Sequence, residues 1–142
     1  MNPTVEKFGY PATLVKEFEH WFVLVRPAQV TLGSLVLAAR SDATAYGALP
    51  RAAFAEQAHA VGAIEEALQR FTGYKRINYL MLMMVDRQVH FHVIPRYSQP
   101  RRWNDVEFPD AGWPGPPRLD SAIKLDAEQL AALVAAISVN FR

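Results

Sequence analysis

Two histidines at alternate positions are the residues best placed to do chemistry in this sequence. They fall in the stretch Gln88-Val89-His90-Phe91-His92, where polar and apolar side chains alternate. Alternate side chains of a β-strand share a face, so Gln88, His90 and His92 should line a polar site while Val89 and Phe91 pack on a core. A neutral imidazole is a good nucleophile near pH 7, and phosphorus is a target within its reach. The pattern alone fits a nucleophilic histidine and, equally, two surface or hydrogen-bonded core histidines.

The same pair of histidines could instead bind zinc, although a zinc site normally needs a third ligand. The next positions on the same face of the strand, Ile94 and Arg96, do not supply one. The sequence contains no cysteine, which excludes disulfides, thiolate metal sites and cysteine nucleophiles. A His-x-His metal-binding protein is therefore the weaker hypothesis, and we expect neither a metal nor a cofactor.

Composition sets the broad class of protein. The 142 residues are 51% hydrophobic and 20% charged, which predicts a single globular domain over residues 1–142. The formal net charge of +1 argues against binding long nucleic acid, whereas a small phosphate ligand needs only a few local donors. No apolar run approaches the roughly 20 residues that span a bilayer. We expect no membrane association and a cytoplasmic location.

The pattern of apolar residues predicts an α+β fold, with an antiparallel sheet, a helix packed on it and a C-terminal helix. Strands are expected over 21–25 and 35–39, and a long helix over 50–72 with Pro50 at its first position. Strands over 77–85 and 89–95 should be joined by a tight hairpin at Asp86-Arg87. Residues 1–17 should form a loose arm or short helical turn. The apolar face of the 50–72 helix is predicted from Phe54, Val61, Ile64, Leu68 and Phe71.

The end of the chain divides into two parts. Residues 98–118 are rich in proline and aromatic residues, and we expect an irregular segment laid over the domain surface or over a partner chain. The last helix is predicted over about 126–140, because Asp126 and Gln129 have the spacing of a capping box. The core of the domain should then span about residues 15–97.

The stretch Gln88-Val89-His90-Phe91-His92-Val93-Ile94-Pro95-Arg96 resembles the signature of the histidine triad (HIT) family, His-x-His-x-His followed by two apolar residues. The expected order of strands and helix over residues 20–96 is similar to that family. The resemblance implies a HIT-like fold, a homodimer with joined sheets, and action on small nucleotide phosphates. It implies that His90 attacks the α-phosphorus to form a nucleotidyl-histidine, which water or another acceptor resolves. His92 would brace the site by bonding to backbone, and dinucleoside polyphosphates and adenylated amines are the substrate classes implied.

This sequence departs from the family pattern in several places. Gln88 stands where the first histidine belongs, and an amide cannot shuttle a proton at neutral pH. Leu32-Gly33-Ser34 replaces the usual Pro-Gly-His, and the predicted hairpin at Asp86-Arg87 is short. Arg26 occupies the place of a ribose-binding Asn or Asp. These departures motivate a second hypothesis, a nucleotide-binding regulatory module with little turnover.

Four residues outside the motif are predicted to bind substrate. Arg87 could replace a missing phosphate donor of the hairpin, and Arg96 follows the motif directly. Asn78 could reach the site from the neighbouring strand, and Arg26 lies at the ribose-binding position. With the catalytic group of His90, His92 and Gln88, these residues form the expected site.

Overall fold

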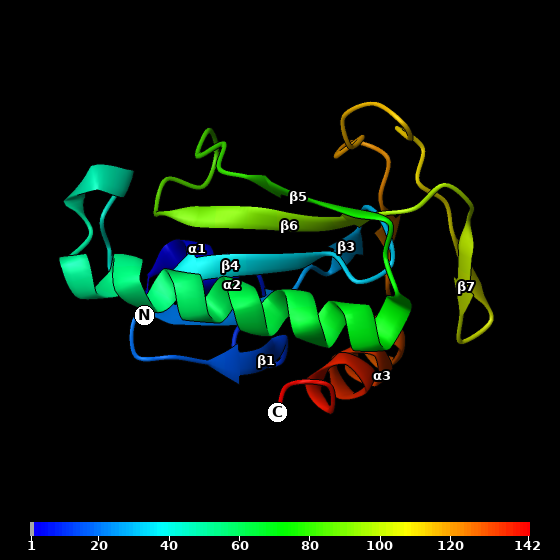
Figure 1. Ribbon diagram of the computed structural model, residues 1–142, viewed down its shortest axis with the longest axis horizontal. Helices are drawn as coiled ribbons and strands as arrows, with labels where there is room; N and C mark the ends of the chain where they lie inside the picture. The colour runs from blue at the N-terminus through cyan, green and yellow to red at the C-terminus, as the bar shows by residue number, and fades with distance from the viewer. Residues whose placement is uncertain (1) are drawn as a thin grey trace.

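The protein forms one five-stranded antiparallel sheet with helices on both faces (Figure 1). The computed structural model describes residues 2–142. The elements are α1 (Pro3–Lys7), β1 (Leu14–Glu17), β2 (Trp21–Val25), β3 (Ala28–Gln29), β4 (Leu35–Ala39), a 3₁₀ turn (Tyr46–Ala48), α2 (Arg51–Thr72), β5 (Arg76–Leu80), β6 (His90–Arg96), β7 (Arg101–Trp103), β8 (Val106–Phe108), β9 (Ile123–Lys124) and α3 (Ala127–Ser138). The strand order in the large sheet is β1-β2-β4-β6-β5. The predicted α+β architecture is therefore confirmed.

The central strands are covered on both faces, which explains their continuous apolar sequences. Every residue of β2 and of β4 is buried. One face, with Trp21 and Leu37, packs against Ile64 and Leu68 of α2 and against α3. The other face packs in a smaller cluster that includes Val5 and Phe8 at the N-terminal end, together with Phe22, Leu24, Val36 and Ala38. Figure 1 shows α2 crossing the front of the sheet while α1 lies behind it.

The long helix begins one residue later than predicted, because Pro50 is its N-cap. At the other end, Gly73 adopts the left-handed conformation (φ 60°) and its N–H donates to the Gln69 carbonyl, as expected of a C-terminal cap. The buried face differs from the predicted one. Phe54 is exposed, and Val61 and Phe71 are only half-buried. Ile64 and Leu68 are buried as predicted, and the other fully buried residues of the helix are Ala53, Ala60 and Ala67.

This correction has a simple physical reason. The strands facing the helix carry large side chains such as Trp21, so small alanines on α2 allow the helix to approach the sheet closely. The C-terminal helix follows prediction more closely. Asp126 and the N3 residue Gln129 form the capping box, and Leu133 and Ile137 are buried.

The connection between β5 and β6 corrects the predicted tight hairpin. Strand β5 ends at Leu80 and β6 begins at His90, so residues 81–89 form a longer loop. The apolar run was interpreted as a strand, but Met84 and Val85 are 84% and 81% exposed and make no ladder bonds. Met83 has φ 51°, a conformation incompatible with an extended strand.

The N-terminal residues and the 98–118 segment are more regular than predicted. Residues 2–17 contain the short helix α1, which matches the predicted helical turn, and also the edge strand β1, which was not predicted. Residues 101–108 form the β7–β8 hairpin. The segment is fixed to the sheet by Asp110, whose carboxylate accepts from both Nε and a terminal nitrogen of Arg96 at 2.7 and 2.9 Å. The backbone N–H of Tyr97 donates to the same carboxylate.

The buried Arg96–Asp110 pair should matter far more for stability than the exposed Arg118–Asp120 pair. Its side chains are 4% and 2% exposed, so Asp110→Ala leaves a buried, unpaired guanidinium and should cost about 3–5 kcal/mol of unfolding free energy. Asp120→Ala removes an exposed pair with Arg118 and should leave the denaturation midpoint unchanged. Urea unfolding of both variants measures this. Equal midpoints for the two variants would contradict the anchoring role.

Candidate functional site

His90 and His92 lie side by side on the face of β6 that points away from α2. The register fixes this arrangement, since His90 pairs with Ala38 and His92 with Val36 in the ladder to β4. Their ring centroids are 5.1 Å apart and nearly perpendicular. Phe8 packs against both rings, at 5.7 and 5.8 Å. Although only 2% and 8% exposed, the two imidazoles border a cavity.

The hydrogen bond of His90 determines its tautomer. Nδ1 lies 2.8 Å from the backbone carbonyl oxygen of Gln88. A carbonyl can only accept, so Nδ1 must carry the proton and donate it. In the neutral ring, Nε2 then holds the free lone pair. A nitrogen in this state can act as a nucleophile or a base.

Gln88 supports His90 through its backbone rather than its side chain. The residue precedes β6, and its side-chain Oε1 accepts from the Thr4 hydroxyl at 2.6 Å. The amide therefore turns toward α1 and lines an adjacent cavity that also includes Arg87, which is exposed. The predicted row of an amide and two imidazoles on one face of the strand is corrected to the two imidazoles alone. The reason is that the ladder with β4 begins only at His90.

His92 is bonded to a cation rather than to backbone. Nε of Arg26 lies 3.4 Å from Nδ1 of His92. A guanidinium can only donate, so Nδ1 is the acceptor and Nε2 carries the proton. Burial, then the charges of Arg26 and His90, lower the pKa of His92 to about 4, with a small opposing effect of Asp86. His92 is therefore neutral at pH 7. Burial also lowers the pKa of Arg26.

The cavity beside the imidazoles has a volume of about 300 Å³ and is bordered by two segments. The 82–86 part of the loop forms one wall, and Lys7 and Phe8 form another. Lys7 Nζ and the Asp86 carboxylate are 2.9 Å apart, so an ion pair joins the two segments. Lys7 and Arg26 together outweigh Asp86 by one positive charge. The cavity therefore favours a small anion.

Sequence reasoning missed Lys7, Phe8 and the loop wall. A signal for α1 is present in the sequence, since Asn2 is a favoured N-cap residue, Pro3 suits the first helical position, and Val5 and Phe8 share one helical face. Asn2 does cap α1 through a bond from the Val5 N–H. No local signal indicates that the helix lies over the histidines, because that placement depends on tertiary packing.

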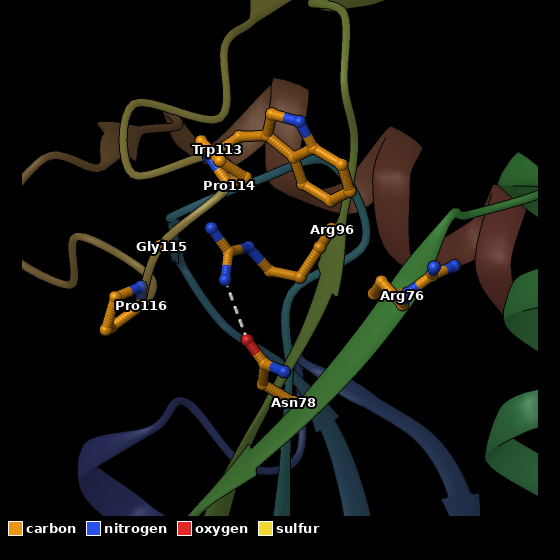
Figure 2. A pocket seen from close by; sticks show the side chains of 7 residues that line it. All are labelled: Arg76, Asn78, Arg96, Trp113, Pro114, Gly115 and Pro116. Carbon is orange, nitrogen blue, oxygen red and sulfur yellow. Dashed lines mark hydrogen bonds between the residues drawn. The ribbon is translucent and has the colours of Figure 1, made fainter.

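Asn78 and Arg96 lie together at the other end of β6. They line a separate cavity and are joined by a 2.8 Å hydrogen bond from Arg96 to Asn78 Oδ1 (Figure 2). Asn78 pairs with Ile94, four residues beyond His90, a distance of about 13 Å along a strand. Of the four predicted substrate-binding residues, the structure brings only Arg26 to the imidazoles, with Arg87 in the adjoining cavity.

A metal would find few ligands here. Within residues 2–142, no three side chains of the His, Cys, Asp or Glu type are grouped closely enough to hold an ion. The pair His90 and His92 therefore has no third partner in the described part of the chain. Across the same residues, no helix combines the length and the apolar character needed to cross a membrane.

Comparison with solved structures shows which known proteins share this fold. A histidine triad protein of Bradyrhizobium japonicum aligns with a TM-score of 0.74 at 18% identity, covering 100% of this chain and 97% of that one. A histidine triad protein of Sinorhizobium meliloti 1021 aligns at 0.74 and 22% identity, covering 99% and 95%. The diadenosine triphosphate hydrolase of Plasmodium falciparum aligns at 0.66 and 12%, covering 91% and 76%.

The chain therefore has the histidine triad fold, as the motif predicted. No family model matches the chain, and no curated protein matches it.

The lowered pKa of His92 predicts a pH dependence of stability. In the unfolded chain this imidazole takes up a proton below about pH 6.5, whereas in the folded protein it does so only near pH 4. Its contribution is therefore complete above pH 6.5 and is lost as the pH falls from 6.5 to 4, by an amount on the order of 1–3 kcal/mol. Chemical denaturation from pH 7 to pH 4 should show a steeper loss for the natural protein than for His92→Asn.

His59→Asn on α2 is the matched control, because His59 is exposed. Its profile should parallel that of the natural protein. Parallel profiles for all three proteins would show that His92 does not contribute in this way.

Proposed function

We propose that the protein is a nucleotide-phosphate hydrolase or nucleotidyl transferase that acts through a covalent nucleotidyl-histidine on His90. The observation that carries this proposal is the bond from His90 Nδ1 to the Gln88 carbonyl, which leaves Nε2 with its lone pair beside a net positive cavity. The shared fold supports it, since one protein with this fold is described as a diadenosine triphosphate hydrolase. Dinucleoside polyphosphates and adenylated amines are the substrate classes we propose.

The proposed reaction has two steps. Nε2 of His90 attacks the α-phosphorus, the N–P bond forms, and the bond from phosphorus to the leaving group breaks, with a proton from solvent completing that group. The modified ring keeps its Nδ1 proton and becomes cationic, so the Gln88 carbonyl stabilises it. Water or another acceptor then attacks phosphorus, the N–P bond breaks, and the acceptor loses a proton to solvent.

Other groups of the cavity have supporting roles in this proposal. Lys7 and Arg26 offset the charge on the phosphoryl oxygens, an electrostatic effect that often dominates such reactions. His92 is a positioning residue, because its neutral ring lies against that of His90 while Arg26 holds it. Arg87 lies in the adjoining cavity, where it can meet a phosphate further along the substrate.

Substitution of His90 tests the mechanism directly. His90→Ala should lower turnover of a panel of dinucleoside polyphosphates and adenylated amines by at least about 1,000-fold, since the nucleophile is gone. Gln88→Ala should lower turnover less than about tenfold, because the backbone carbonyl that bonds His90 remains. Mass spectrometry of the natural protein mixed with an activated nucleotide should find the adduct on His90. Unchanged turnover in His90→Ala would end this mechanism.

A nucleotide-binding module with little turnover is the second candidate. The observation in its favour is the close cover over the nucleophile, since His90 is 2% exposed and Phe8 packs on its ring. Calorimetry distinguishes the two functions. Micromolar binding of nucleotide without product after long incubation would favour the binding module over the enzyme.

We further propose that the protein is a homodimer. Strand β5 is an edge strand of the large sheet, and an unpaired edge offers backbone groups to a second copy. The exposed apolar side chains of Leu82, Met84 and Val85 follow it directly. Size-exclusion chromatography with light scattering should give twice the 16.0 kDa chain mass. A mass of one chain at micromolar concentration would exclude a stable dimer.

A further inference from the structure

A second cavity, of about 500 Å³, lies where β5 begins and β6 ends, far from His90. It shares no lining residue with the cavity beside the imidazoles. Figure 2 shows its walls, with Arg96 and Asn78 from the sheet on one side and the 113–116 turn on the other. The cavity is formed where the 98–118 segment crosses the sheet. Its volume is in the range of sites that hold nucleotide-sized ligands.

The polar wall is rigidly built. The side chain of Arg96 is 4% exposed, and its guanidinium donates three hydrogen bonds, two to Asp110 and one to Asn78. A guanidinium has five N–H groups, so two donors on its terminal nitrogens are left for a further acceptor. The bond to Oδ1 also orients the Asn78 amide, whose NH₂ group can then donate only toward other partners. Together the two side chains hold fixed donors at the cavity wall.

The charge at the cavity is positive. Asp110 neutralises Arg96, but Arg76 lines the rim, and among residues 2–142 no carboxylate forms an ion pair with it. Its one hydrogen bond goes to the Lys75 carbonyl, and Figure 2 shows its exposed guanidinium turned away from Arg96. An exposed arginine with this freedom can turn toward an anion at the cost of one hydrogen bond.

The remaining wall is aromatic. The half-buried indole of Trp113 lies above the Arg96 side chain in Figure 2 and lines the cavity. The flat indole face is a surface on which a planar ring can stack. A ligand that stacks on Trp113 and also accepts hydrogen bonds from the polar wall therefore combines a planar ring with an oxyanion.

We propose that this cavity is a binding site for a nucleoside monophosphate, with its phosphate at Asn78, Arg96 and Arg76 and its base against Trp113. The site is independent of the chemistry at His90, because the two cavities have separate walls. Occupancy would add contacts between the 98–118 segment and the sheet. The ligand would thus reinforce the anchor that Asp110 provides.

The test is a titration of the full chain with adenosine 5′-monophosphate, followed by the indole N–H signals of the tryptophans in ¹⁵N-resolved NMR. The Trp113 signal should shift on binding, whereas that of Trp21, whose Nε1 is buried and donates to the Ala53 carbonyl, should not. Inorganic phosphate alone and adenosine alone should each bind at least tenfold more weakly. The ring signals of His90 and His92 report the other cavity separately.

Charge reversal at the rim identifies the site. Arg76→Glu should weaken the binding reported by Trp113 at least tenfold, because it places a carboxylate beside the phosphate. Arg51→Glu is the matched control, an exposed arginine on α2 outside this cavity, and should change the affinity less than twofold. A stationary Trp113 signal, equal affinity for phosphate and monophosphate, or an unaffected Arg76→Glu variant would overturn the proposal.

Discussion

The alternation of side chains along β6 is the constraint on which both cavities depend. This strand lies between β4 and β5, and its ladders fix the register on either side. Phe91 and Val93 face the α2 core, so His90, His92 and Arg96 must face the opposite side. A slip of one residue would place imidazoles in the apolar core and expose the apolar set. The apolar half of the strand therefore specifies where its polar half lies.

Each buried polar side chain on this face is satisfied by a different part of the chain. The Gln88 carbonyl accepts from His90, Arg26 donates to His92, and Asp110 accepts from Arg96. Within the described residues, no buried side-chain nitrogen or oxygen lacks a partner. Because an unpaired buried polar group is costly, the row of polar residues also determines where the 26–28 loop and the 98–118 segment must sit. The same hydrogen bonds therefore orient the polar side chains of β6 and hold the surrounding segments in place.

The sequence predicted the elements whose signals are local. The strands 21–25 and 35–39 were predicted with their observed bounds, and the capping box at Asp126 was found from spacing alone. The motif also identified the face shared by His90 and His92. The sequence could not predict features that depend on tertiary packing. The apolar 81–85 run resembles a strand in sequence, yet most of it lines the cavity beside the imidazoles. Likewise, Arg96 was grouped with the histidines because it follows the motif, and Asn78 because it lies on the neighbouring strand. The ladder instead pairs Asn78 with Ile94, so the extended strand separates both residues from His90.

The short helix α1 covers the imidazoles without belonging to the sheet. Five residues are too few for a stable isolated helix, so α1 depends on its cap and on the contacts of Asn2, Thr4 and Lys7 with the body of the protein. The ring of Phe8, which packs against both imidazoles, thus follows directly on a short helix that is separate from the sheet. For protein engineering, this makes position 8 an entry point for reshaping the cavity beside the imidazoles, since the strands that set the histidine geometry would keep their own sequence and register.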